Sequence, residues 1–257
     1  MASLSLAAVQ ASEIHSPRLY SDATQRPYGL LYHNVQNPLS YDSSHAVVLD
    51  LESDIGSALD DIASFYRSLH ITPRVYTAFQ APKEEQLLLP LLQEHGYALS
   101  RADWHVLAWQ CASEPSSTPP LEVRRVRALD DPVIALINAE EPQPWNVGLL
   151  QRYLASECLH LLVGYHHSEP ICMAALSILD GISRVDDVQT HPAWRGRGYA
   201  RALMQYLVRY HQEVSSNALY LLTDNPTALR VYRDVGFAAT PFGLSFWSAW
   251  LEDHPTH

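Results

Sequence analysis

The chain has few cysteines and no apolar run long enough to cross a membrane. Its three cysteines, Cys111, Cys158 and Cys172, lack metal-type spacing, and none of the thirteen histidines forms a His-x-x-x-His pair. We therefore expect no metal site, and reduced, mostly buried thiols in a cytoplasmic protein. A helix needs about 18 or more consecutive apolar residues to span a bilayer, and no stretch of the sequence approaches that length. A membrane partner is therefore not expected.

Positive charge is also scarce. Lysine and arginine together number 17 against 28 acidic residues, which gives a net charge of −11 and a pI near 5.5. A nucleic-acid-binding protein should carry a basic surface, so this charge argues against nucleic acid as a partner, whereas a cationic substrate is compatible with it. The first twelve residues contain no lysine or arginine, so they make a poor signal peptide and are expected to form a loose arm.

The most informative segment runs from Thr190 to Met204. A strand expected at Val185–Thr190 leads through a proline-containing turn into Arg195-Gly196-Arg197-Gly198 and then directly into a helix. The helix is indicated by an apolar stripe at helical spacing, formed by Ala200, Leu203, Met204, Leu207 and Val208. A glycine turn that opens a helix directs free N–H groups and the positive end of the helix dipole at one point, and the arginines add charge. This segment predicts a pyrophosphate-binding turn.

A second pattern follows closely. An apolar strand beginning at Leu219 leads to Asn225, suited to the N-cap of a helix, and to Pro226 at the first helical position. Ala228, Val231, Tyr232 and Val235 share one face of this helix, and Gly236 stands where a left-handed residue ends it. The pattern predicts a strand–helix–strand unit.

Together these two patterns resemble the GNAT acyltransferase family. No Gly-Lys-Ser/Thr follows the turn, so it is not a Walker loop. Arg195-x-x-Gly198-x-Ala200 after Thr-His-Pro is instead similar to the acetyl-CoA loop of that family, and the second pattern resembles its final strand–helix–strand unit. The resemblance implies an α/β (α+β) fold with a mixed central sheet flanked by helices. It also implies an N-acetyltransferase with acetyl-CoA as co-substrate.

The resemblance also assigns the cofactor side of the site. It implies that Val188, Gln189, Thr190, Arg195, Gly196, Arg197, Gly198, Tyr199, Ala200 and Asn225 contact acetyl-CoA, with the Val188 N–H facing the thioester oxygen. Tyr232 would protonate the departing thiolate, since its hydroxyl has an ordinary pKa of about 10. The alternative for Tyr232 is a core aromatic whose hydroxyl has a structural partner.

The acceptor side is expected around two adjacent acids. Strand alternation sends Asp186 and Asp187 to opposite faces, so one of them can enter the acceptor cleft. Asp186 is the expected base, directly or through a water molecule, with Asp187 as helper; the alternative is a solvated pair or a salt bridge to Arg184. Glu140, Glu141 and Trp145 lie in a loop that would suit a cationic ligand, or would simply be a proline-stiffened surface loop.

The chain is expected to contain two domains, 1–117 and 118–257, joined by a proline- and serine-rich linker at 114–120. The first resembles a degenerate copy of the second, because Gly56 and Gly96 match Gly196 and Gly236 at a separation of 140 residues (196 − 56 and 236 − 96). At this separation Ile55, Ala58 and Leu92 replace Arg195, Gly198 and Tyr232. The first domain is therefore expected to lack an acetyl-CoA site.

This layout is similar to tandem antibiotic-type acetyltransferases. It implies a small-molecule amine substrate, and within that group an aminoglycoside of the kasugamycin class, hence antibiotic resistance. Polyamine or peptide and protein acetylation remain alternatives, as does a non-catalytic acyl-CoA-binding module. A homodimer is compatible with the family's exposed strand edges.

Overall fold

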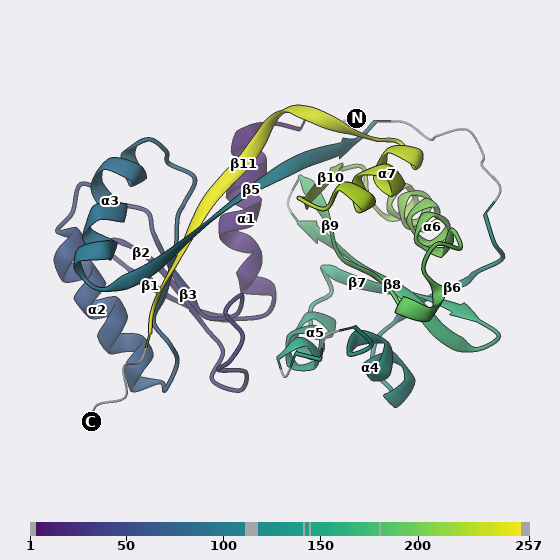
Figure 1. Cartoon of the computed structure of the whole chain (residues 1–257), viewed down its shortest axis with the longest axis horizontal. Helices are drawn as coiled ribbons and strands as arrows, with labels where there is room; N and C mark the ends of the chain where they lie inside the picture. Colours follow the sequence, from purple (N-terminus) through teal and green to yellow (C-terminus); the bar gives the residue numbers. More distant parts are fainter. Residues whose placement is uncertain (1–3, 111–117, 141, 144, 180, 253–257) are drawn as a thin grey trace. The chain divides into compact units, whose positions relative to one another are not determined.

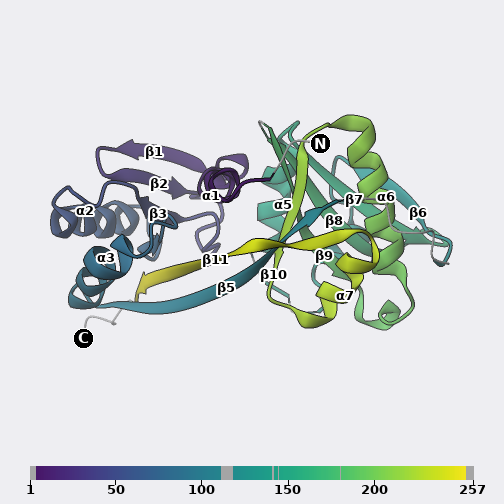
Figure 2. The same ribbon diagram turned by 90° about the horizontal axis from the view of Figure 1, so that it is seen from above.

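The computed structural model describes residues 4–110, 118–140, 142–143, 145–179 and 181–252 (Figure 1). The chain forms two compact units. Unit 1 contains Met1–Ser12 and Trp104–Gly243, and unit 2 contains Glu13–Asp103 and Leu244–His257. Two long strands, β5 (Tyr97–Trp109) and β11 (Phe237–Leu251), each contribute residues to both units (Figure 2).

Unit 1 is built on a mixed sheet with the strand order β5-β10-β9-β8-β7-β6. Strands β9 and β10 are parallel and the other neighbours are antiparallel. Helices α6 and α7 lie on one side of the sheet and α4 and α5 on the other (Figure 1). The elements are β6 (Glu122–Val126), α4 (Asp131–Ile137), α5 (Asn146–Leu154), β7 (Leu159–His166), β8 (Glu169–Leu179), β9 (Ile182–Thr190), η2 (Pro192–Trp194), α6 (Tyr199–Val214), β10 (Ala218–Thr223) and α7 (Pro226–Asp234).

The core of unit 1 confirms the two patterns read from the sequence. Four members of the predicted α6 stripe, Leu203, Met204, Leu207 and Val208, are buried against β7, β8 and β9. Helix α7 begins after the N-cap Asn225, with Pro226 at its first position, and Gly236 follows it with φ +96°. The apolar faces of both helices therefore fix the end of β9 and the start of α6 in one place.

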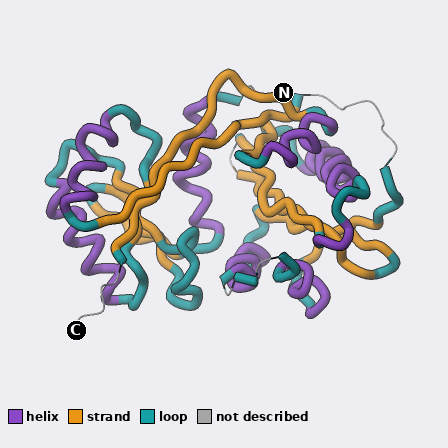
Figure 3. The backbone as a smooth tube through the Cα atoms, in the orientation of Figure 1, coloured by secondary structure: helices purple, strands orange, loops and turns teal. Residues whose placement is uncertain are grey.

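The strands of unit 2 are mixed in direction and follow the order β1-β2-β3-β4-β11. Figure 3 shows its helices α2 and α3 beside these strands. Leu59, Ile62 and Tyr66 of α2 and Leu88 and Leu92 of α3 are buried in its core. The elements are α1 (Leu6–His15, shared with unit 1), η1 (Ser16–Leu19), β1 (Asp22–Arg26), β2 (Gly29–His33), β3 (His45–Val48), α2 (Ile55–Ser68), β4 (Arg74–Tyr76) and α3 (Lys83–Glu94), with the end of β11.

The element order confirms the repeat. The series β2-β3-α2-β4-α3-β5 repeats as β8-β9-α6-β10-α7-β11, and in both series the first strand pair is antiparallel and the next parallel. The expected register at the helix start is wrong, however, because Gly56 is already the second residue of α2. The N-caps Asp54 and Gly198 correspond instead, at a separation of 198 − 54 = 144 residues.

The units exchange strand segments, so neither follows the chain continuously. Strand β4 pairs with Ser248–Trp250 of β11, and β10 pairs with His105–Ala108 of β5. Each sheet therefore takes its neighbouring strand from the other repeat. The limits 1–117 and 118–257 stay a prediction, and most of the expected linker lies outside the described residues.

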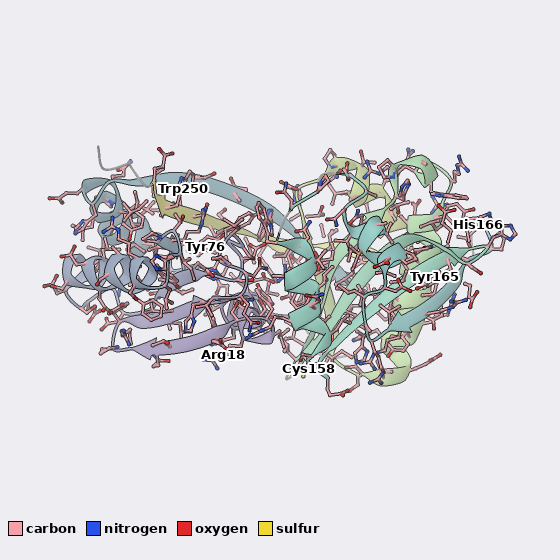
Figure 4. All side chains as sticks on the ribbon, turned by 90° about the horizontal axis from the view of Figure 1, so that it is seen from below. Arg18, Tyr76, Cys158, Tyr165, His166 and Trp250 are labelled. Atoms are coloured by element: carbon pink, nitrogen blue, oxygen red, sulfur yellow. The ribbon has the colours of Figure 1, made fainter. Side chains whose placement is uncertain are left out.

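The sequence predicted a loose arm at residues 1–12, and for the described residues 4–12 this prediction is wrong. Leu6–His15 form helix α1, Val9 is fully buried, and the Tyr220 hydroxyl donates to Ser12 Oγ at 2.8 Å. Among the thiols, Cys172 is buried as expected, but Cys158 is exposed (Figure 4), and Cys111 lies outside the described residues. None of the described helices has the length and apolarity needed to cross a membrane.

Candidate active site

The predicted pyrophosphate turn lies between β9 and α6. Gly196 and Gly198 have φ +74° and +85°, and Gly198 is the N-cap of the 16-residue helix α6. A Cβ at Gly196 would meet nothing within 4 Å, so glycine is needed there for backbone conformation rather than for space. The first backbone bond of the helix runs from Ala202 N–H to the Gly198 carbonyl at 3.0 Å. The preceding N–H groups of Tyr199, Ala200 and Arg201 thus lie at the positive end of the helix dipole, as an anion site requires.

The two arginines of the turn have different surroundings. Arg195 forms a two-point ion pair with Glu140: Nη1 donates to Oε1 at 2.8 Å and Nη2 to Oε2. Its Nε also donates to the Thr190 carbonyl at 3.1 Å. Hydrogen bonding to Arg195 lowers the pKa of Glu140. The Arg197 guanidinium lies 5.0 Å above the Trp194 ring, a cation–π contact.

An aromatic cluster that sequence reasoning missed stands beside this turn. His166, labelled in Figure 4 at the β7–β8 hairpin, lies 4.8 Å from the Trp194 ring, and its Nδ1 is 3.3 Å from the Tyr199 hydroxyl. The hairpin reverses through His167 and Ser168, whose positive φ angles are those of a two-residue turn normally built with glycine or asparagine. The contacts join the hairpin to the start of α6. The only sequence signal was the aromatic residues around the glycine motif.

Strand β9 has a β-bulge at the predicted acids. Ala175 pairs with Asp186 and Met173 with Gln189, so β9 contains one residue more than β8 over this stretch. Asp187, inside the bulge, has φ +50°. A bulge breaks the two-residue alternation of a strand. The argument that placed Asp186 and Asp187 on opposite faces therefore does not hold for this strand.

A cavity of about 260 Å³ opens beside the bulge, towards α4 and α5. Its walls are partly apolar and partly polar, and they are formed by Ile137, Glu140, Asn146, Leu149, Leu150, Met173, Asp187, Val188 and Gln189. The structure thus brings together Glu140, Asp187, Val188 and Gln189 from the predicted set. Asp186 and Trp145 do not line this cavity; Trp145 is the N-cap of α5. Glu141 lies outside the described residues.

Gln189 has a role that the sequence did not indicate. Its side-chain Nε2 donates to the Leu136 carbonyl at 2.8 Å and to the Ile137 carbonyl at 3.4 Å. These carbonyls lie at the end of α4, and the Leu136 carbonyl also accepts the Ala139 N–H at 3.1 Å. Gln189 therefore links β9 to the end of α4 by hydrogen bonds, beside the cavity that both elements line.

Asp186 and Tyr232 are the predicted base and the predicted acid of the reaction. Asp186 Oδ2 lies 2.9 Å from Arg184 Nη2, the salt bridge considered from sequence, and its Oδ1 accepts the Asp187 N–H at 3.1 Å. Tyr232 is buried, with its ring 6.2 Å from that of Phe237. Burial, and secondly the charge of Asp186, raise the pKa of Tyr232 to about 12. The hydroxyl therefore keeps its proton through the physiological range.

Asn225 performs the capping role predicted for it. Its Oδ1 accepts the N–H groups of Thr227 at 2.9 Å and Ala228 at 3.3 Å. This fixes the start of α7, the helix that carries Tyr232. Its contact with a cofactor stays a prediction. Within the described residues no three His, Cys, Asp or Glu side chains are grouped as metal ligands.

Unit 1 thus combines a mixed sheet, a bulged strand and a glycine turn at a helix start, which is the arrangement of the GNAT fold. Residues 130–237, which span both helix pairs and the turn, match the acetyltransferase (GNAT) family. This segment of the chain is therefore similar to that family.

Solved structures share the fold over nearly the whole chain. A GCN5-related N-acetyltransferase from Kribbella flavida is 17% identical, with a TM-score of 0.66 and coverage of 99% of this chain and 98% of that one. A functionally unknown conserved protein from Staphylococcus epidermidis is 15% identical, with a TM-score of 0.64 over 92% and 96% of the two chains. A tandem GNAT protein from the clavulanic acid biosynthesis pathway is 14% identical, with a TM-score of 0.52 over 82% and 76%. No curated protein matches this sequence.

Proposed function

We propose that the protein transfers the acetyl group of acetyl-CoA to a small cationic amine. The observation that carries this proposal is the end of β9. There Asp187 and Val188 of the bulge are among the residues that line a cavity, and the strand then leads into a glycine turn that suits a pyrophosphate. The proposed anion site and the proposed cation site would thus be joined by one short segment of backbone.

In this reaction the amine nitrogen attacks the thioester carbonyl, and the carbon–sulfur bond then breaks. In this proposal the N–H of Val188, which lies in the bulge, stabilises the oxyanion, a contribution of about 3 kcal/mol in comparable sites. Tyr232 donates its proton to the departing thiolate. A carboxylate is a weak base for an ammonium group, so Asp186 or Asp187 would take the amine proton through a water molecule.

The aminoglycoside assignment is a narrower form of the same proposal. Two acidic residues, Glu140 and Asp187, are among those that line the cavity, which favours a cationic amine over a neutral one. The cavity of about 260 Å³ is slightly below the usual range for drug-sized ligands, about 300–1,000 Å³. It would therefore receive the amine-bearing part of a kasugamycin-type molecule, or the whole of a short polyamine.

Thiol release from acetyl-CoA, measured over a panel of amines, tests this function. The panel includes aminoglycosides with kasugamycin, polyamines, amino acids and short peptides. We expect turnover with a compact cationic amine and none with its neutral analogue. Turnover only with peptides would replace the small-molecule assignment, and acetyl-CoA binding without any turnover would favour a non-catalytic acyl-CoA-binding module.

A further inference from the structure

We propose that Glu140 couples the two binding sites, because its carboxylate is shared between the phosphate-binding turn and the amine cavity. In this proposal coenzyme A displaces Glu140 from Arg195, and the released carboxylate then joins Asp187 in binding the cationic amine. The inference rests on the proposed function and extends it to a specificity-determining residue.

The contacts of Glu140 place it in both sites. It follows α4 and lines the cavity together with Asp187 and Asn146. Both of its carboxylate oxygens are nevertheless engaged by Arg195, which belongs to the phosphate-binding turn. The residues are separated by 55 positions in the chain, so the pair is a tertiary contact between the α4–α5 loop and the turn. One ion pair therefore joins the wall of the amine cavity to the predicted anion site.

A phosphate and the Glu140 carboxylate compete for the same face of Arg195. Two-point binding of a guanidinium suits phosphate as well as carboxylate, and both ligands use the Nη1 and Nη2 donors. The Nε donor is already held by the Thr190 carbonyl, so the side chain stays aimed along the turn while its outer donors change partner. With Arg195 neutralised by phosphate, Glu140 is an uncompensated anion at the cavity wall.

The exposure of this pair sets the size of the effect. The side chains of Arg195 and Glu140 are 46% and 56% exposed, so solvent screens their attraction and the competition is modest. Exposed pairs of this kind correspond to changes of about two- to fivefold in a dissociation constant. By linkage, the factor by which coenzyme A tightens amine binding equals the factor by which the amine tightens coenzyme A binding.

Binding of coenzyme A and of n-butylamine to the full chain tests this proposal, because coenzyme A without an acetyl group allows a ternary complex with no turnover. Calorimetry would give the Kd of coenzyme A, and NMR titration the Kd of n-butylamine with and without saturating coenzyme A. The variants are Glu140→Gln and, as a control, Glu122→Gln. Glu122 pairs with Arg124 at 2.6 Å with similar exposure on β6, and neither lines the cavity.

We expect Glu140→Gln to bind coenzyme A about two- to fivefold more tightly than the wild type, and Glu122→Gln to match the wild type. Saturating coenzyme A should tighten n-butylamine binding severalfold in the wild type and leave it unchanged in Glu140→Gln. Equal or weaker coenzyme A binding by Glu140→Gln would overturn the coupling, since Glu140 would then only orient Arg195. Failure of the wild type to bind coenzyme A at all would instead overturn the proposed function itself.

Discussion

Tyr232 illustrates how burial suits a residue to one chemical role. The hydroxyl lies in the core of unit 1 and near the carboxylate of Asp186, both of which disfavour its ionised form. In this environment a tyrosine hydroxyl stays protonated at neutral pH, so it is suited to donate a proton and not to accept one.

Replacing Tyr232 with phenylalanine should therefore lower kcat by about a hundredfold, the usual contribution of a positioned general acid, with little change in acetyl-CoA affinity. Steady-state kinetics with calorimetric binding would measure both effects. The control is Tyr206→Phe, which changes a half-buried tyrosine of α6 that stacks on Tyr210. An unchanged kcat in Tyr232→Phe would remove this residue from the mechanism.

The pH dependence of the reaction rate should also reflect the protonated state of Tyr232. Because the pKa of Tyr232 is raised to about 12, its hydroxyl stays protonated as pH rises from 7 to 10. The hydroxyl begins to lose its proton only above that range. The rate of the chemical step should therefore show no decline from Tyr232 between pH 7 and pH 10. A pre-steady-state rate profile that falls with an apparent pKa near 9, and whose fall disappears in Tyr232→Phe, would contradict this environment.

At the scale of elements, helix starts distinguish the two repeats. Gly198 caps α6 with φ +85°, and a Cβ there would lie 3.2 Å from Pro119 Cδ. At the corresponding position of α2, Asp54 accepts the Ser57 N–H at 3.1 Å. The carboxylate thus occupies one of the N–H groups that would otherwise bind an anion, and it repels phosphate.

Alanine substitution should therefore have opposite effects at two helix-start glycines. Gly198→Ala is expected to lower the free energy of unfolding by about 1–2 kcal/mol, because alanine resists a positive φ. Gly56→Ala, within the first turn of α2, should raise it by about 0.5–1 kcal/mol, since its added Cβ meets only ordinary contacts at 3.4 Å or more. Urea unfolding would measure both. Equal effects at the two sites would mean that the turn has no conformational requirement for glycine.

These elements also show which features of the fold and site could be predicted from the sequence. Caps and apolar spacing are local signals, so α6, α7 and their glycines were predicted closely. The bulge at Asp187 was missed, because one inserted residue in a strand leaves no mark on a two-residue alternation. The Arg195–Glu140 pair and the Gln189 bonds to α4 were missed as well, because they join residues more than 50 positions apart and depend on the tertiary fold.

At the scale of the whole molecule, the repeat raises the question of how many cofactors one chain binds. The element order is the same in both series, but among the described residues only unit 1 has the glycine turn, the arginines and a tyrosine on its last helix. In unit 2 Leu92 occupies the place of Tyr232, and Asp54 the place of Gly198. We propose that unit 2 is a scaffold without an acetyl-CoA site.

Titration calorimetry of the full chain with acetyl-CoA tests the central claim most directly, when the wild type is compared with the double variant Arg195→Ala/Arg197→Ala. We predict one acetyl-CoA per chain in the wild type, and binding weakened about tenfold or more in the variant, because charge-assisted contacts to phosphate are lost. Two sites per chain, or one site whose affinity is unaffected by the double variant, would contradict the assignment of the cofactor to the glycine turn of unit 1.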